Sequence, residues 1–277
     1  FVYLAKNRIS DVQYLFYFIN EKLTAQNKEE FEEILGSLIN FENPAIIKIH
    51  GYSLIKNPII ITNYPQNNSL FNAIFGSKKP SSNLTVTKKY IIFLGTALAM
   101  RELHKNNIVH GDLNPSNIFL DENYYPQISA YDYKYLFSSY ENEKNDDFVI
   151  FVAPEVNDTN EKTKEGDVFS FTMISYILFT GYFPNFSGDR NNYSRRKKIS
   201  KGIRPNIKFI TDKDQIQFFQ DGWNQEPDKR FTFDDLVDQL LRGKYQNAFD
   251  GFDENEVTYY INSFKKGDDS IEVKFKK

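Results

Sequence analysis

The sequence contains no cysteine among its 277 residues. Without thiols the chain can form no disulfide, thiolate nucleophile or thiolate metal site, which is compatible with a reducing compartment. Long apolar runs are missing too, because none approaches the roughly 18 residues that a membrane-spanning helix needs. The first residues also lack the charged and then apolar pattern of a signal peptide. These absences predict a soluble, cytoplasmic protein without a membrane span.

Neither sign of charge is in large excess. The 34 lysine and arginine residues nearly balance the 37 aspartate and glutamate residues, and the formal net charge is -3. This balance gives no reason to expect nucleic acid or an anionic membrane as the main partner. With 40% hydrophobic and 26% charged residues, the composition is that of a globular protein. The length suits one large domain or two lobes that share an interface.

Apolar and aromatic residues follow the periods of strands and helices along the chain. Short runs rich in β-branched and aromatic residues predict strands, and runs at helical spacing predict helices. The predicted strands cover residues 1–5, 12–19, 45–52, 58–64, 118–120 and 126–129. The predicted helices cover residues 28–38, 68–75, 85–105, 168–179 and 254–264. The helix at 168–179 is apolar on nearly every side, which predicts that it is buried all round.

Residues 108–120 read IVHGDLNPSNIFL, a polar turn between two apolar runs. Within this stretch His110, Asp112 and Asn117 have the spacing H-x-D-x-x-x-x-N. This is the layout of a phosphotransferase catalytic loop, in which the Asp takes a proton from a hydroxyl group and the Asn holds a metal ion. On these residues the chain resembles the eukaryotic protein kinase family.

Further motifs of that family follow downstream. Ala153-Pro154-Glu155 matches its A-P-E, residues 166–171 (GDVFSF) resemble its S-D-V-x-S-F, and residues 227–230 match its P-x-x-R. The resemblance implies a buried ion pair between Glu155 and Arg230. It covers nearly the whole chain.

The resemblance implies an α+β fold of two lobes, the protein-kinase-like fold, over residues 1–243. The small, β-rich lobe is expected at 1–62, without the family's first strand and glycine-rich loop. A hinge is expected at 63–67 and a larger, mainly helical lobe at 68–243. Residues 244–277 are expected as a C-terminal extension that packs on the large lobe or trails from it.

Several positions that carry the family's chemistry hold other residue types. Tyr17 stands where the family has its phosphate-holding lysine, and Asn114 stands where it has the lysine that contacts the transferred phosphate. Asn117 keeps a metal-ligand position, but Ala130 replaces the Asp that is the principal metal ligand. Ile34 replaces the helix glutamate that pairs with the lysine. The resemblance therefore implies that the charges needed for phosphoryl transfer are largely missing.

Other residues could supply some of these charges in a different alignment. Glu33 could take the place of the helix glutamate, and Lys6 could take the place of the lysine. Asp132 stands two places late for the metal-binding position, where a shift of the backbone could aim it at a metal.

The nucleotide pocket that the resemblance implies is degenerate. Its residues are expected to be Leu15, Tyr17, Thr62, Asn63, Tyr64 and Phe119. Leu15 stands where the family has a small alanine, and Phe119 where it has a leucine, so the pocket is expected to be crowded. No G-x-G occurs in the chain, although such a loop could precede Phe1. The alternative is that these aromatic and aliphatic residues are ordinary core side chains.

A hydrophobic stack that ties the two lobes together is also implied. Its members are expected to be Leu38, Ile49, Tyr131 and His110, standing on Asp167. His110 is then a structural residue, whose ring packs under Tyr131 and whose nitrogen meets the backbone or Asp167.

Two features concern regulation and partners. Gly111 replaces an arginine whose usual partner in the family is a phosphate on the activation segment, so activation by that route is not expected. A basic run consists of Arg195, Arg196, Lys197, Lys198 and Lys201. A solvated helix face is the favoured interpretation of this run, and a docking patch is the alternative.

Three hypotheses of function follow. The first is a pseudokinase, which binds and regulates protein partners and needs no cofactor. The second is an active Ser/Thr or Tyr kinase that uses ATP and Mg²⁺, with Asp112 as base and with Asp132 or Glu33 as a substitute. The third is a small-molecule phosphotransferase, because H-G-D-L-x-P-x-N is also a spelling of aminoglycoside-type and choline-type kinases. The A-P-E motif and the buried helix argue against the third.

Overall fold

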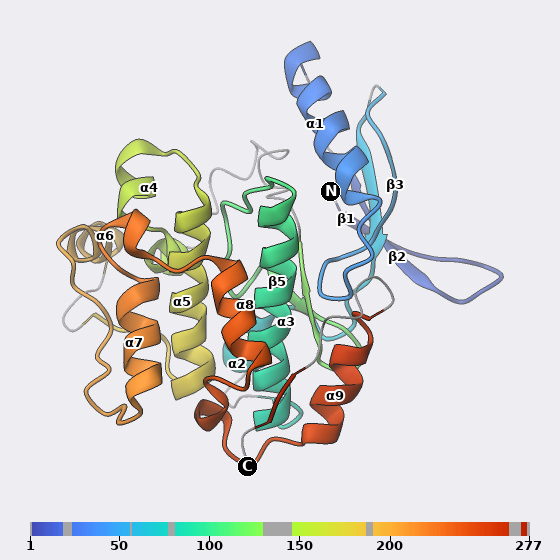
Figure 1. Ribbon diagram of the computed structural model, residues 1–277. Coiled ribbons are helices and arrows are strands. Elements are labelled where there is room, and N and C mark those ends of the chain that lie inside the picture. The colour runs from blue at the N-terminus through green and yellow to red at the C-terminus, as the bar shows by residue number, and fades with distance from the viewer. Residues whose placement is uncertain are drawn as a thin grey trace.

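The computed structural model describes residues 2–18, 24–55, 57–76, 81–129, 146–186, 191–265 and 273–275, which form a small and a large lobe (Figure 1). The residues expected at the principal metal-binding position and beside it, Ala130, Tyr131 and Asp132, lie outside these ranges.

The small lobe is an antiparallel sheet of four strands with one helix. The strands, in the order β1-β2-β4-β3, are β1 (Val2–Lys6), β2 (Gln13–Phe18), β4 (Ile59–Asn63) and β3 (Ile49–Ser53). Because side chains alternate across a strand, Ile60 and Thr62 turn to the same face, where both are fully buried. Helix α1 (Ala25–Leu38) adds Phe31 and Leu35 to the hydrophobic cluster that contains Ile60. The predicted N-terminal hairpin and the helix that follows it are confirmed.

The predicted strand at 45–52 is wrong in its first residues, because β3 begins only at Ile49. The residues before it pair with the large lobe instead. The N–H of Ile47 donates to the carbonyl of Ile128 at 2.9 Å, and the N–H of Ile128 donates to the carbonyl of Ala45 at 2.8 Å. This short parallel bridge connects the two lobes by backbone hydrogen bonds.

The large lobe contains a two-stranded sheet and most of the helices. Strands β5 (Ile118–Leu120) and β6 (Pro126–Ile128) are antiparallel. The α-helices are α2 (Leu70–Phe75), α3 (Val86–Lys105), α4 (Pro154–Thr159), α5 (Lys164–Thr180), α6 (Asn192–Ser200), α7 (Lys213–Gly222), α8 (Phe233–Leu241) and α9 (Glu254–Asn262). The 3-10 helices are η3 (Asp146–Phe151), η4 (Pro227–Lys229) and η5 (Gln246–Phe249). No helix in the described ranges combines the length and the apolar character that crossing a bilayer requires.

Helix α5 lies at the centre of the large lobe, and every residue from Gly166 to Leu178 is buried. It begins earlier than predicted because Thr163 caps it: the Thr163 hydroxyl accepts a hydrogen bond from the N–H of Gly166 at 2.9 Å. The first turn is polar and gave no apolar signal. The helix ends at Gly181, whose φ of +74° lies in the left-handed region that glycine adopts at low cost.

The C-terminal extension packs on helix α3 through a close contact. Tyr260 of α9 is buried, and its hydroxyl group lies against the backbone of Gly95 in α3, in the space where a Cβ atom would stand. Nearby, the N–H of Asp253 donates to the Thr87 hydroxyl at 3.0 Å. Only glycine at position 95 allows α9 to come this close to α3.

We expect Gly95→Ala to destabilise the protein by about 1 to 3 kcal/mol, because the new methyl group overlaps the Tyr260 ring. Urea unfolding followed by far-UV circular dichroism measures this change. Gly36→Ala in α1 is the matched control, since its Cβ would meet only the Tyr52 hydroxyl, at 3.8 Å. The control should be neutral or stabilising. Equal stability of the two variants would contradict the packing of α9 on α3.

Candidate functional site

The catalytic-like loop is anchored to helix α5 by the buried side chain of Asp167. The N–H groups of His110 and Gly111 each donate to this carboxylate at 2.8 Å. The ring nitrogen Nε2 of His104 lies 2.9 Å from the same carboxylate. A buried carboxylate requires such partners, so the loop is fixed at the first turn of α5.

Sequence analysis did not find the role of His104. Its only signal is its place in the last turn of α3, directly before the loop. The same helix end is held by Lys164, whose ammonium group donates to the carbonyl of His104 at 2.7 Å. The contact of His104 with Asp167 joins residues far apart in the chain, which no local pattern reveals.

Within the loop, two amide side chains converge on Asp112. Asn117 donates through Nδ2 to the Asp112 carboxylate at 2.8 Å and to the Asp112 carbonyl at 2.7 Å. Asn114 donates to the same carboxylate at 3.1 Å and to the same carbonyl at 3.0 Å. The structure therefore brings the three predicted residues together. Asn114 is buried and braces the loop, so it does not reach outward as a long cationic side chain would.

His110 is buried, with 1% of its surface exposed. Its Nδ1 atom accepts a hydrogen bond from the N–H of Asp112 at 3.2 Å. This is a contact to the backbone, as the sequence analysis expected of a structural residue. Leu38 and Ile49 are also buried in the core. The predicted contact of the His110 ring with Tyr131 lies outside the described residues.

Tyr17 and Leu15 share one face of the small-lobe sheet with Thr62. Leu15 pairs with Thr62, and Tyr17 pairs with Ile60. The Tyr17 hydroxyl forms a hydrogen bond with the Thr62 side chain. Burial raises the pKa of Tyr17 above its ordinary value of 10.0, against a smaller lowering by the Thr62 hydrogen bond, so the phenol is neutral at physiological pH.

Asn63 does not join this face, because neighbouring residues of a strand point to opposite sides. Its amide oxygen lies 2.5 Å from Nε2 of His50, whose ring packs edge to face on Tyr14. Tyr64 is half-buried directly after β4. Phe119 is half-buried on β5, where it pairs with Gln127.

Arg230 and Glu155 form an ion pair with two hydrogen bonds, at 2.6 and 2.9 Å. The Arg230 side chain is fully buried and also donates to the carbonyl groups of Glu165 and Asn224. All of its hydrogen bonds go to fixed acceptors. The pair therefore ties the start of α4 to the segment around η4.

The guanidinium groups of Arg204 and Arg230 both lie over the aromatic ring of Phe169. The Arg204 and Arg230 groups stand 5.1 and 5.2 Å from the ring centre of Phe169. Burial, and then the charge of Arg230, lower the pKa of Arg204 to about 10. Arg204 is therefore still protonated at physiological pH, and its donors reach the carbonyl groups of Trp223 and Ile199 at 2.8 and 2.9 Å.

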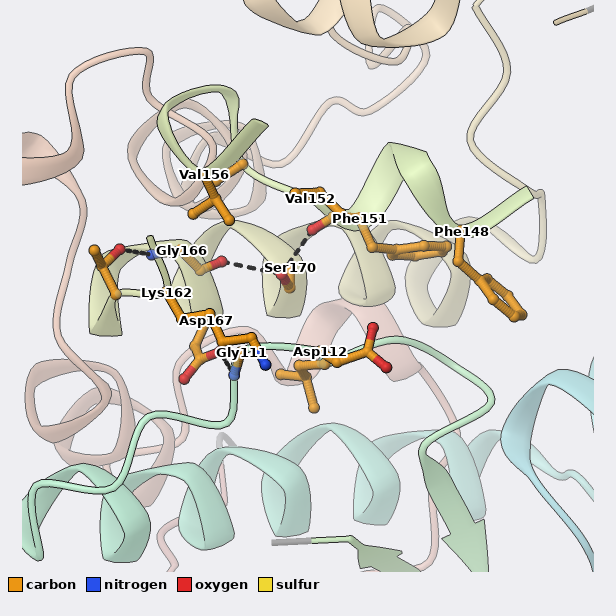
Figure 2. Close-up of a pocket in the computed structure, with 13 residues that line it drawn as sticks. Gly111, Asp112, Phe148, Phe151, Val152, Val156, Lys162, Gly166, Asp167 and Ser170 are labelled. Carbon is orange, nitrogen blue, oxygen red and sulfur yellow. Dashed lines mark hydrogen bonds between the residues drawn. The ribbon is translucent and has the colours of Figure 1, made fainter. Parts of the chain in front are cut away.

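A small, open pocket lies between the loop and the elements before α5 (Figure 2). Phe148, Phe151 and Val152 from η3 and the residue after it give it an apolar wall. Asp112 lines the pocket on the Phe148 side and Lys162 on the Gly166 side (Figure 2). The pocket thus offers an apolar surface between an acid and a base.

Comparison with known proteins gives a consistent picture. A family model described as protein tyrosine and serine/threonine kinase matches residues 5–240. A probable serine/threonine-protein kinase of Dictyostelium discoideum is 30% identical over 224 residues, which are 80% of this chain and 24% of that protein. A putative serine/threonine-protein kinase/receptor of Acanthamoeba polyphaga mimivirus is 28% identical over 223 residues, 79% of this chain and 13% of that protein.

A protein kinase and PP2C-like domain-containing protein of Arabidopsis thaliana is 23% identical over 266 residues, which cover 80% of this chain and 40% of that protein. The chain thus spans less than half the length of each of these relatives.

We expect Arg230→Ala to destabilise the protein by about 3 to 5 kcal/mol, because it leaves the Glu155 carboxylate without its partner in a largely buried place. Much of the protein should then be unfolded at 37 °C. Thermal unfolding followed by circular dichroism measures the loss. Lys229→Ala is the neighbouring control, because the Lys229–Glu226 pair is exposed and its loss should have little effect. A melting temperature of Arg230→Ala within a degree of wild type would contradict the role of the pair.

Proposed function

Because the chain belongs to the family of protein tyrosine and serine/threonine kinases, we propose that it is a pseudokinase, a kinase-fold domain that binds and regulates protein partners without transferring phosphate. The observation that carries this proposal is the environment of Tyr17. At the position that the resemblance gives to a lysine, a neutral phenol is hydrogen-bonded to Thr62.

Phosphoryl transfer depends on positioning and on the neutralisation of developing negative charge. Tyr17 supplies no positive charge to a phosphate. Asn114 holds the loop together and supplies none either. Each of these losses removes transition-state stabilisation, and every 1.4 kcal/mol lost is about a tenfold loss of rate. Asp112 alone, as a base, does not replace them.

The residues present do not fit ATP with Mg²⁺. Asn117 donates its amide nitrogen to Asp112, which leaves its amide oxygen as a single candidate Mg²⁺ ligand. The partner ligand is missing, because the sequence has a methyl group at Ala130 where the family has a carboxylate. We therefore expect neither ATP nor Mg²⁺ as a cofactor.

Two observations weigh against the alternative of an active kinase. Lys6 pairs with Asp11 at 2.9 Å in the exposed turn of the first hairpin, opposite Gln13 in the sheet, and so lies away from Tyr17. Glu33 is exposed on α1. Neither residue is placed to supply the missing ion pair. The small-molecule phosphotransferase is disfavoured because the kinase match extends through Glu155 and Arg230, whose ion pair belongs to the protein-kinase pattern.

We expect the melting temperature of the purified domain to shift by less than a degree with about 1 mM ATP and excess Mg²⁺, since a ligand stabilises only in proportion to its binding. Differential scanning fluorimetry measures this. The comparison is the double variant Tyr17→Lys with Ala130→Asp, which returns both charges and should shift more than wild type. A Mg²⁺-dependent shift of several degrees in the wild-type protein would overturn the proposal.

A further inference from the structure

A segment of the C-terminal tail, residues 273–275, lies at the corner of the chain that follows helix α8 (Figure 1). The N–H of Lys274 donates to the carbonyl of Leu241, the last residue of α8, at 2.7 Å. The carbonyl of Lys274 accepts a hydrogen bond from Nε2 of Gln246 at 2.8 Å. The protein thus pairs with both backbone groups of one tail residue, as it would with an added strand.

The side chains on either side of Lys274 contact the protein, whereas Lys274 itself is exposed. Val273 is buried in the hydrophobic core cluster. The ring of Phe275 lies 5.8 Å from the ring of Phe252, centre to centre. Phe252 in turn packs on Tyr90 of α3 at 4.7 Å. This alternation is that of an extended strand, so the corner accepts an apolar residue, then any residue, then an aromatic residue.

The end of α8 provides an acceptor and a space for peptide backbone. The last carbonyl groups of a helix have no partner within it, so the carbonyl of Leu241 is available to the tail. Gly243 follows with a φ of +82°, and the carbonyl of Lys274 fills the space that a Cβ atom at position 243 would take. Any side chain at 243 therefore competes with a peptide bound at the corner.

Gln246 provides the matching donor. Its side chain is 4% exposed, and its amide nitrogen also donates to the Tyr90 hydroxyl at 3.2 Å. A buried amide needs acceptors, so loss of the tail costs Gln246 one of the partners that it has in this structure. Another extended peptide can restore both hydrogen bonds, because every residue except proline carries one N–H and one carbonyl group. The chemistry of the corner therefore favours a peptide as its occupant.

We propose that this corner recognises an extended segment of a protein partner with the pattern apolar-x-aromatic, and that residues 273–275 occupy it until the partner binds. The backbone of the segment pairs with Leu241 and Gln246. Its apolar and aromatic side chains take the places of Val273 and Phe275. The proposal rests on the proposed function only in taking a protein as the partner, and it deepens that function by naming the surface and the chemistry of the partner.

A labelled copy of the tail tests whether the corner binds a peptide that is not part of the chain. The probe is fluorescein-labelled SIEVKFKK, the sequence of residues 270–277, measured by fluorescence anisotropy. The tail variant, Val273→Asn with Phe275→Asn in the full chain, removes the two side chains that hold the tail. It should bind the probe at least tenfold more tightly than wild type, because a tethered tail competes at an effective concentration of about 1 mM. The same peptide with Asn in place of Val and Phe should bind neither protein.

Two glycine variants, each added to the tail variant, test the place of binding. Gly243→Ala puts a methyl group where the peptide carbonyl lies and should weaken binding of the probe at least tenfold. Gly251→Ala is the matched control, because its φ of +79° gives a similar backbone strain but its Cβ would meet no atom within 4 Å. The control should keep the affinity within twofold. Melting temperatures show that both proteins are folded.

A peptide of foreign sequence tests recognition of the pattern itself. Labelled Gly-Ser-Thr-Val-Gln-Phe-Ser-Gly shares with the tail only the order of Val, one residue and Phe. The tail variant should bind it within fivefold of the affinity for SIEVKFKK. Light scattering over a range of protein concentrations tests whether the occupant is instead the tail of a second copy. We expect wild type to remain a monomer.

Failure of the tail variant to bind SIEVKFKK more tightly than wild type would overturn the proposal, and so would an equal loss of binding in the two glycine variants. Binding of the chain's own sequence without the foreign one would show a tail contact that serves the fold alone. A wild-type dimer that the tail variant does not form would assign the corner to a second copy. Either result would also overturn the proposal. These measurements need no ATP, so a failure here leaves the absence of phosphate transfer untouched, and a failure of the ATP experiment leaves the corner untouched.

Discussion

The rest of the structure depends on the buried carboxylate of Asp167. Two backbone N–H groups of the catalytic-like loop and one ring nitrogen of His104 meet it within 2.9 Å. A carboxylate in the interior is costly unless such partners are present, so the loop can take only the path that supplies them. Helix α5 presents Asp167, and α5 is itself buried on all sides by the large lobe. The position of α5 in the core therefore sets the geometry of the loop.

In this chain, the positions that hold the shape of the fold keep the residue types expected of the family, whereas the positions that the resemblance gives to phosphate contacts do not. Residues that hold the shape are present in their expected contacts: Glu155 meets Arg230, and Asp167 meets the loop. At the two positions that the resemblance gives to phosphate-contacting lysines, the chain has a neutral phenol, Tyr17, and a buried amide, Asn114. A protein partner recognises shape, apolar surface and charge at the surface, and none of these needs a phosphate-binding lysine. This difference supports the proposal of a binding module.

Sequence reasoning predicted the elements that have a periodic apolar pattern or a compact local motif. The loop around Asp112 and the buried helix α5 were recognisable because their spacing and apolar character are local. The contact of His104 with Asp167 and the bridge from Ala45–Ile47 to Ile128 were not, because they join residues far apart through backbone and polar atoms. The pairing of Lys274 with Leu241 and Gln246 was hidden for the same reason. Strand pairing places Tyr17 and Thr62 on one face of the small-lobe sheet and the Asn63 side chain on the other, and the sequence analysis made no prediction of these faces.

The central claim is that this kinase fold does not transfer phosphate, and a transfer assay tests it most directly. The purified domain is incubated with radiolabelled ATP, Mg²⁺ or Mn²⁺ and general protein substrates, beside its Asp112→Asn variant. That variant removes the carboxylate of Asp112, which stands at the base position of the loop, while keeping an oxygen for one of the two amide donors. Circular dichroism confirms that both proteins are folded. The account predicts equal, background incorporation by the two proteins. Incorporation by wild type at least tenfold above Asp112→Asn would contradict it.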